Sequence, residues 1–348
     1  KNILSCGFTV DEQGRKMSKS LGNGVDPADV TSKWGADVLR LWVASADYAQ
    51  DVSISDNILK QVSDAYRRFR NTFRFLLGNL SDFDDQANAV SNWDDLEPID
   101  QYMMAKTAQL LSDVEQAYDS FKFNGVYRAV YDFVNDLSSV YMDVTKDRLY
   151  SESPDSPRRR AVQTVLFNIL EVLVRVLSPI LSFTADEVWE CYPEAMRNRE
   201  GRVCNVQLAG WLHRSDFVPA LPGKAAEDKV LAAFGGALEV RDVVTKALED
   251  ARGAKVINKS QEATVSVTAP QATLDALSAF DASVFEELFI VSGVTFAAGD
   301  ELACEVKPAE GDKCPRCWNY RELGGNANHA DVCQRCGDAL DAIGFTEE

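Results

Sequence analysis

Two Cys-x-x-Cys pairs near the end of the chain constrain its fold more than any other feature. The pairs are Cys314-Pro-Arg-Cys317 and Cys333-Gln-Arg-Cys336, separated by fifteen residues. Two such pairs at this separation supply four thiolates to one tetrahedral zinc, and four cysteine ligands leave no open position for a substrate. The pattern therefore predicts a structural zinc, with disulfides as the weaker alternative. His329 lies between the pairs, and we interpret it as a bystander.

The remaining cysteines do not form a pattern. Cys6, Cys191, Cys204 and Cys304 are scattered along the 348 residues. This usage is typical of a reducing cytosol, so we expect a cytoplasmic protein. No stretch approaches the roughly 20 apolar residues of a membrane span, and no signal peptide is recognisable. The length allows two or three domains. Because the chain begins with Lys1 and not with Met, we expect a fragment of a longer protein.

The charge of the chain is strongly acidic but unevenly distributed. There are 36 basic against 54 acidic residues, a net charge of −18. An evenly acidic surface would repel nucleic acid. Residues 81–120, however, carry 10 acidic residues and 1 basic residue, whereas residues 1–80 carry 11 basic and 9 acidic. Basic residues cluster elsewhere, at 67–74, 146–148 and 158–160, so nucleic acid remains a possible partner.

Hydrophobic periodicity predicts a mainly α-helical protein. Helices are expected to begin after Asp26 and Ser55, and longer ones over 97–119, 123–149 and 157–177. Together they predict a helical bundle across residues 50–190, in which 157–177 is the apolar central helix. Thr184 and Glu187 form a predicted capping box for one more helix.

The pattern changes after Trp211. A helix over 225–251, a strand over 263–268 and a helix over 272–280 are expected, followed by strands over 289–296 and 302–306. These elements predict a small α+β unit before the cysteine-rich end.

A second motif, Lys-Met-Ser-Lys-Ser at residues 16–20, lies on a loop that contains glycines. Lysines three apart suit anion binding, because ammonium groups act as point charges while hydroxyls and backbone N–H groups add directed hydrogen bonds. The alternative for such a short motif is a solvated basic turn.

The longer string KMSKSLGN resembles the second signature of class I aminoacyl-tRNA synthetases. Further strings are similar to the isoleucyl branch of that family, including GADVLRLWVAS at 35–45 and YRRFRNTFRFLLGNL at 66–80. KDRLY at 146–150 and LSFTADEVW at 181–189 fit its helical anticodon-binding domain, and the KCPRCW…CQRC ribbon resembles the bacterial type. The resemblance covers the chain, more loosely over 214–310.

The resemblance implies roles for the loop residues. By this resemblance ATP is bound by five residues of the loop, which are Lys16, Met17, Ser18, Lys19 and Ser20. Lys16 and Lys19 are the implied catalytic residues, with Lys19 as the main contact to the phosphates in the transition state. For the full-length enzyme the resemblance implies isoleucine and ATP as substrates and Mg as a cofactor. It also implies that tRNA-Ile is the partner and that the enzyme is a monomer.

The resemblance also implies a domain order. Residues 1–46 are the end of a Rossmann-type catalytic domain, 47–213 the anticodon-binding bundle, 214–310 an α+β junction and 311–348 the zinc ribbon. The HIGH signature of the family is missing, since the only histidines are His213 and His329, and so is the editing domain. We expect a C-terminal fragment that binds tRNA but does not catalyse aminoacylation. A valyl-type region and an unrelated zinc-ribbon interaction protein are the alternatives.

Candidate RNA contacts follow from charge and spacing. Arg67, Arg70 and Arg74 share one helical face, for which a merely solvated face is the alternative. Arg148 ends a predicted helix, where the dipole also favours a cation, whereas Arg158 opens a helix, where it does not. Arg316 and Trp318 flank Cys317. Trp318 is either a stacking platform for an unpaired base or packed under the zinc site.

Overall fold

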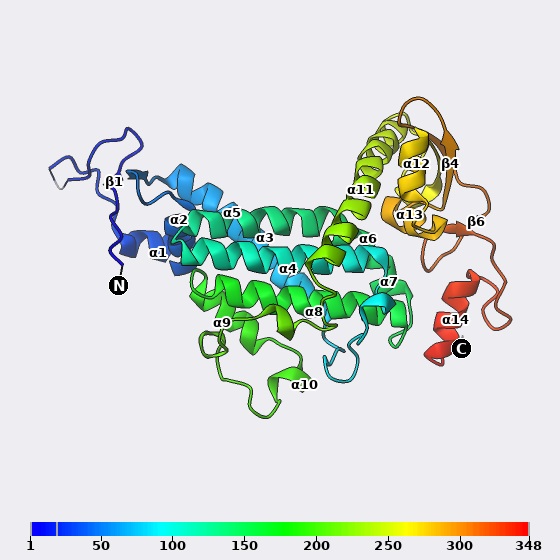
Figure 1. Ribbon diagram of the computed structural model, residues 1–348, viewed down its shortest axis with the longest axis horizontal. Helices are drawn as coiled ribbons and strands as arrows, with labels where there is room; N and C mark the ends of the chain where they lie inside the picture. Colours follow the sequence, from blue (N-terminus) through cyan, green and yellow to red (C-terminus); the bar gives the residue numbers. More distant parts are fainter. Residues whose placement is uncertain (1, 19, 347–348) are drawn as a thin grey trace. The chain divides into compact units, whose positions relative to one another are not determined.

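The computed structural model describes residues 2–18 and 20–346 and divides into two compact units. The first comprises the chain up to Ala89, with Lys106–Ser138 and Gln163–Val218. The second comprises Val90–Ala105, Ser139–Val162 and the chain from Pro219. Two long helices, α4 (Pro98–Asp119) and α8 (Pro157–Leu177), contribute to both units (Figure 1). Within the described ranges, no helix has the length and apolar composition needed to cross a membrane.

The first unit begins with a short parallel strand pair. Strand β1 (Thr9–Val10) pairs with β2 (Val52–Ser53), and the connection contains α1 (Pro27–Trp34) and α2 (Ala36–Ser45). The Asp26 carboxylate accepts from the Ala28 N–H at 2.8 Å, which is the predicted N-cap of α1. A parallel pair with a helical crossover matches the expected end of an α/β domain.

The rest of the first unit is the predicted helical bundle. It contains α3 (Asp56–Asn79) and α5 (Phe123–Asp136) beside segments of α4 and α8, followed by α9 (Ser182–Glu190) and α10 (Glu194–Arg197) (Figure 1). The Phe69 ring of α3 meets two tyrosine rings of α5 edge-on. Tyr118 of α4 donates to the Val176 carbonyl of α8 at 2.8 Å. Helix α8 is buried almost all round, as predicted for the central helix.

The predicted capping box of α9 is wrong. Its N-terminal N–H groups are capped by Asp37 of α2, whose carboxylate accepts from the Thr184 N–H and hydroxyl at 2.7 and 2.6 Å. Glu187, the other half of the expected box, forms a bidentate ion pair with Arg70 of α3. A carboxylate from a distant segment thus satisfies the free helix terminus in place of a local one.

The helix predicted over 123–149 is interrupted. After α5 the chain forms a π turn at Leu137–Tyr141, then α6 (Met142–Val144) and α7 (Lys146–Ser151). A π turn inserts an additional residue into a helical ladder, and such turns are frequent at functional sites.

The second unit contains the predicted α+β fold. Helices α11 (Lys224–Gly253), α12 (Gln271–Leu277) and α13 (Ala282–Phe289) pack on a sheet of order β4-β3-β5. Strand β3 (Ala263–Ala269) pairs in parallel with β4 (Gly293–Ala298) and antiparallel with β5 (Ala303–Pro308). The strand expected over 289–296 begins four residues late, because Phe289 ends α13. The cysteine ribbon contains β6 (Asp312–Lys313), β7 (Tyr320–Arg321) and α14 (Gln334–Ala342).

A fully buried arginine joins three helices of the second unit. Arg148 of α7 is 0% exposed, and its guanidinium donates to both carboxylate oxygens of Asp100 in α4 at 2.7 and 3.1 Å. Its Nε lies 2.5 Å from a carboxylate oxygen of Glu287 in α13. Tyr141 also donates to Asp100, at 2.7 Å. Each buried charge therefore has a partner, which is the condition for tolerating charge in a low-dielectric interior.

Replacing Arg148 by Met should destabilise the protein by about 3–5 kcal/mol, because Asp100 would remain buried without its cation and Glu287 would keep only Arg158. Urea unfolding monitored by circular dichroism measures this change. Lys146→Met is the matched control, since Lys146 is exposed and forms only a surface ion pair with Asp143; it should change stability by less than about 1 kcal/mol. Equal effects of the two substitutions would contradict a structural role for the buried network.

Candidate functional site

The four cysteines of the ribbon converge on one point. The thiols of Cys314, Cys317, Cys333 and Cys336 are all buried and lie within 4.8 Å of one another. The sulfurs of Cys317 and Cys333 are 3.8 Å apart, and zinc–sulfur bonds of about 2.3 Å in a tetrahedron require a separation of about 3.8 Å. His329 is buried but outside this cluster, with Nε2 3.4 Å from Asp341, so the bystander interpretation is confirmed.

The chemistry of the thiols also fits a divalent cation. A hydrogen bond from Cys336 lowers the pKa of the Cys317 thiol to about 4, while that bond raises the pKa of Cys336. Burial raises the pKa of Cys333. Four adjacent thiols cannot all ionise without a cation, because their charges repel one another, and zinc removes that repulsion. The ribbon therefore binds one structural zinc through these four cysteines.

The zinc ribbon is anchored on α7 by the arginine that precedes the second cysteine of each pair. Arg335 forms a bidentate ion pair with Asp147, including Nη2 to Oδ1 at 2.9 Å. Arg316 donates through Nη1 to the Ser151 carbonyl. Arg316 therefore has a structural contact that holds the ribbon in place, and its expected RNA contact stays a prediction.

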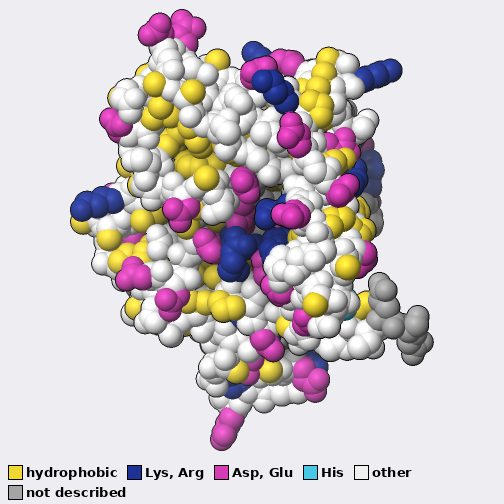
Figure 2. Space-filling view, turned by 90° about the vertical axis from the view of Figure 1, so that its right-hand side faces the viewer, with side chains coloured by type: hydrophobic (Ala, Val, Ile, Leu, Met, Phe, Trp, Pro, Cys, Tyr) yellow, Lys and Arg dark blue, Asp and Glu magenta, His cyan; other side chains and the backbone are white. Residues whose placement is uncertain are grey.

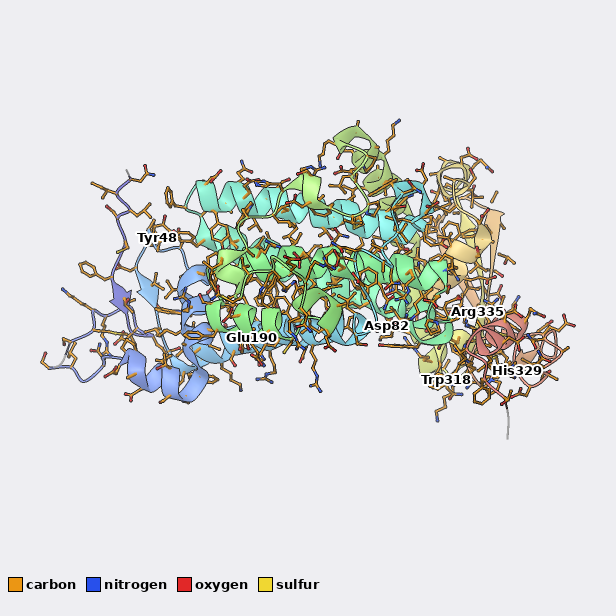
Figure 3. The ribbon with its side chains drawn as sticks, turned by 90° about the horizontal axis from the view of Figure 1, so that it is seen from below. Tyr48, Asp82, Glu190, Trp318, His329 and Arg335 are labelled. Carbon is orange, nitrogen blue, oxygen red and sulfur yellow. The ribbon has the colours of Figure 1, made fainter. Side chains whose placement is uncertain are left out.

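Trp318 is not packed beneath the zinc site. Its side chain is 48% exposed, and its φ of 64° directs the backbone through the left-handed region. The Nζ of Lys259 lies 4.1 Å from the ring centroid and that of Lys313 at 5.9 Å. Figure 3 labels Trp318 and Arg335 in the ribbon. An open indole ring beside two ammonium groups has the chemistry of a base-stacking platform. Sequence reasoning missed Lys259, which lies 59 residues away along the chain.

A cavity of about 260 Å³ lies beside the ribbon anchor, and its basic side chains are compensated by acids. Figure 2 shows basic side chains gathered in a hollow with acidic ones at its margin. The charged residues that line the cavity are Glu97, Asp147, Arg158, Glu286, Glu287, Arg321 and Arg335. Four acids against three bases leave no excess positive charge for a phosphate.

The KMSKS loop follows β1 and is open to solvent. The ammonium of Lys16 lies 4.8 Å from the centre of the Phe8 ring, and within the described part of the chain it has no carboxylate partner. The hydroxyls of Ser18 and Ser20 are 3.1 Å apart, and Met17 is half-buried. Lys19 lies outside the described residues. The loop thus presents an uncompensated cation and two hydroxyls, as anion binding requires.

The arginines of α3 differ in whether their charge is neutralised by an ion pair. Arg67 is 68% exposed with a weak surface ion pair to Asp64 at 3.1 Å, and Arg74 is exposed with no ion pair among the described residues. Arg70 is tied to Glu187 at 2.7 and 2.9 Å, so its charge is largely compensated. Arg67 and Arg74 therefore remain the stronger candidates on this face.

The predicted RNA contact of Arg148 is wrong, whereas that of Arg158 stays a prediction. Arg148 is completely buried and paired with Asp100 and Glu287, so it cannot reach a phosphate. Arg158 is 39% exposed, but three carboxylates surround it at 2.6–3.3 Å. That acidic environment explains how an arginine is tolerated at the N-terminus of α8, where the helix dipole is unfavourable.

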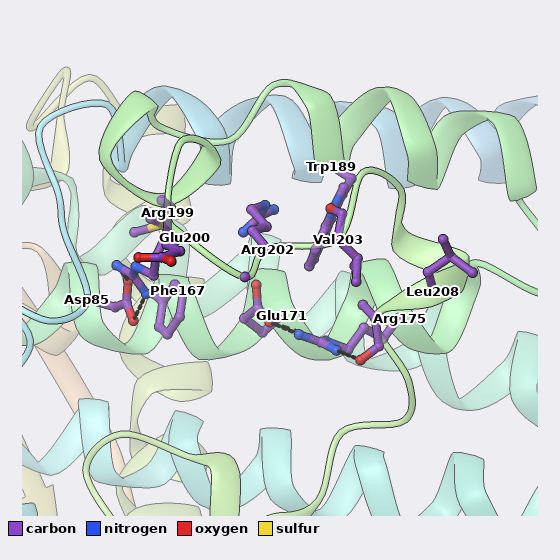
Figure 4. A pocket seen from close by; sticks show the side chains of 13 residues that line it. Asp85, Phe167, Glu171, Arg175, Trp189, Arg199, Glu200, Arg202, Val203 and Leu208 are labelled. Carbon is purple, nitrogen blue, oxygen red and sulfur yellow. Dashed lines mark hydrogen bonds and ion pairs between the residues drawn. The ribbon is translucent and has the colours of Figure 1, made fainter.

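The first unit contains a further cavity of about 380 Å³ between α8 and the loop after α10 (Figure 4). Its arginines are also occupied: Arg175 pairs with Glu171 at 2.6 Å and Arg199 with Asp85 at 2.6 Å. The guanidinium carbon of Arg202 lies 3.6 Å from the centre of a Trp189 ring. Arg199 and Arg202 thus attach the loop to Asp85 and to α9, whereas Arg175 is paired within α8, so the three arginines are accounted for structurally.

Three family models match successive parts of the chain. The tRNA synthetases class I (I, L, M and V) model matches residues 1–55, and the anticodon-binding domain of tRNA ligase matches residues 100–267. The zinc finger found in FPG and IleRS matches residues 311–338. The first match contains the KMSKS loop, and the third contains all four zinc-binding cysteines.

Similar proteins cover almost the whole chain. The isoleucine–tRNA ligase of Geobacillus kaustophilus is 46% identical over 97% of the chain, and that of Symbiobacterium thermophilum 43% identical over 98%. The chain spans about 36–37% of the length of these relatives. Among solved structures, a leucyl-tRNA synthetase complex from Agrobacterium radiobacter K84 matches 89% of this chain with 27% of its own chain. The sequence identity is 17% and the TM-score is 0.47.

The KMSKS loop, the helical bundle and the zinc ribbon thus occur together in one chain, which belongs to the class I aminoacyl-tRNA synthetases. Within that class it corresponds to the C-terminal part of a bacterial-type isoleucyl-tRNA synthetase.

Cys333→Ser should remove bound zinc and unfold the ribbon, because a hydroxyl is a poor replacement for a thiolate ligand. Elemental analysis of purified protein should find about one zinc per chain before the substitution and much less after it. Cys204→Ser is the control, since Cys204 is exposed and outside the cluster. Unchanged zinc content after Cys333→Ser would contradict the assigned ligand set.

Proposed function

We propose that this chain is the tRNA-binding and KMSKS-bearing part of a synthetase that activates isoleucine with ATP and Mg²⁺ and transfers it to tRNA-Ile. The observation that carries the proposal is a KMSKS loop and a four-cysteine ribbon in one chain 46% identical to an isoleucine–tRNA ligase. The chain spans only about 36% of that relative. We therefore expect it to bind tRNA but to need the rest of the synthetase for catalysis.

In this proposal the loop stabilises charge on the phosphates of ATP. Attack by the isoleucine carboxylate on the α-phosphate displaces pyrophosphate, so negative charge increases on the departing oxygens. Lys16 and Lys19 supply positive charge there, and Ser18 and Ser20 supply hydroxyl donors. The uncompensated ammonium of Lys16 supports this role.

The proposed RNA contacts are exposed groups without buried partners, and each unit contributes its own. Arg67 and Arg74 of α3 are the proposed phosphate contacts, and Trp318 with Lys259 is the proposed stacking platform. Phosphate contacts bind any tRNA, whereas stacked and hydrogen-bonded bases distinguish one tRNA from another. We further propose that the synthetase acts as a monomer in the cytoplasm, where its tRNA and amino acid are available.

The chain should bind purified tRNA-Ile more tightly than tRNA-Val, as measured by filter binding at several salt concentrations. Substituting Glu for both Arg67 and Arg74 should weaken binding of both tRNAs and reduce the salt slope by about 2, because two phosphate contacts are lost. Lys229→Glu together with Lys246→Glu changes the net charge equally at exposed sites on α11 and serves as the control. Equal affinity for the two tRNAs would refute the isoleucine assignment.

A second prediction concerns the KMSKS loop in the full-length synthetase. Lys19→Ala should slow isoleucine-dependent ATP–pyrophosphate exchange by about 100-fold or more, because a cation facing the transferring phosphates is removed. Binding of tRNA-Ile should be unchanged. A normal exchange rate would remove Lys19 from the mechanism.

A further inference from the structure

We propose that Asp11 and Asn23 are positioning residues that hold the KMSKS loop in its active shape. Asp11 lies outside the string KMSKSLGN and Asn23 is its last residue, and the sequence analysis assigned neither a role. The inference rests on the proposed function of the loop, but its structural part can be tested without catalysis.

The carboxylate of Asp11 accepts the hydrogen bonds that fix the start of the loop. Although the surrounding loop is exposed, Asp11 is only 7% exposed. One carboxylate oxygen accepts from the backbone N–H groups of Gln13 and Arg15 at 3.0 and 2.8 Å. The other accepts from Arg15 Nε at 2.8 Å and from the Asn23 amide at 2.9 Å. A carboxylate with four donors is held in one orientation by all of them.

Asn23 extends this connection to the far end of the loop. Its Nδ2 donates to Asp11, twelve residues earlier, and its Oδ1 accepts from the backbone N–H of Ser18 at 2.9 Å. The Ser18 hydroxyl in turn accepts from the Leu21 N–H at 3.2 Å. The two ends of the loop are therefore joined through one amide side chain that also grips the backbone between the two lysines.

Strand β1 connects this clamp to the folded unit. Asp11 directly follows Val10, which pairs with Ser53 of β2 and also forms a bridge with Lys16. The Asp11 N–H donates to the Arg15 carbonyl at 3.0 Å. The position of the first lysine is therefore set by the strand pair and by the turn that Asp11 closes. A clamp of this kind reduces the conformational freedom that must otherwise be lost when ATP binds.

The charge of Asp11 is secured by the same contacts. Hydrogen bonds from Arg15 and then Asn23 hold the pKa of the Asp11 carboxyl well below its usual range. A carboxyl whose pKa is lowered in the folded state stabilises that state above its unfolded pKa, and this contribution is lost as the pH falls through the folded value. The clamp is therefore intact at neutral pH.

The test exchanges the two side chains in the full-length synthetase. Asp11→Asn places an amide N–H against the donors of Arg15 and Asn23. Asn23→Asp places a second carboxylate against Asp11. In the double variant D11N/N23D an amide N–H at position 11 faces a carboxylate at position 23. The N23D carboxylate can still accept from the Ser18 N–H. Glu12→Gln is the matched control, since Glu12 is exposed and adjacent to Asp11.

Two readouts separate positioning from general stability. Hydrogen exchange of the Arg15 and Ser18 amides in the protein without substrates reports the clamp itself. ATP–pyrophosphate exchange reports its consequence. Each single variant should speed amide exchange and lower the kcat of pyrophosphate exchange roughly 10- to 100-fold. Binding of tRNA-Ile and the thermal midpoint of the protein should stay near those of the Glu12→Gln control. The double variant should recover part of both losses, because the contact between positions 11 and 23 is restored while Arg15 Nε still faces an amide N–H.

Three results would overturn the proposal: amide exchange unchanged in both single variants, an unchanged kcat, or a double variant no better than the singles. Absence of pyrophosphate exchange in the unsubstituted synthetase would instead refute the proposed function, and the hydrogen-exchange arm would still decide whether the clamp exists.

Discussion

A buried ion pair determines how the second unit is assembled. Arg148 has no exposed surface, and its guanidinium connects Asp100 of α4 with Glu287 of α13. Removing Arg148 would leave the buried Asp100 carboxylate without its cation, so the helices that carry these groups must pack together. Arg158 adds another contact to Glu287, and helix α7, which contains Arg148, also provides the surface on which the zinc ribbon is anchored.

The ribbon is therefore more than a zinc-stabilised appendage. The arginine inside each cysteine pair is aimed at α7, at Asp147 and at the Ser151 carbonyl. Zinc fixes the two loops, and the loops direct the two arginines. Both arginines are engaged by the protein. The exposed groups that remain for a ligand are Trp318 of the ribbon and Lys259, which lies near its ring. Basic residues that pattern alone would assign to RNA thus divide into anchors and exposed candidates.

The KMSKS loop near the start of the chain also combines exposed residues with residues that hold its shape. Among the residues that the structure describes, Lys16 is exposed without a carboxylate partner, whereas the side chains of Asp11 and Asn23 make their hydrogen bonds within the loop. A loop that must contact phosphates cannot bury its lysines, so its shape has to come from neighbouring polar residues. The overall charge of −18 is compatible with such a site, because the acids are concentrated elsewhere or neutralised within the fold.

The sequence by itself determined the zinc ligands, the motif of the loop, the helical bundle and the α+β unit, because these depend on spacing and periodicity along a continuous segment. Cys314 to Cys336 and the N-caps Asp26 and Ser55 are such local signals. Only the tertiary structure decided which arginines are free, since Arg148, Arg158 and Arg316 find their partners on other elements. It also replaced the predicted capping box at Thr184 with Asp37, 147 residues away. No local pattern encodes a partner at that distance, because burial and long-range pairing are set only when the elements pack.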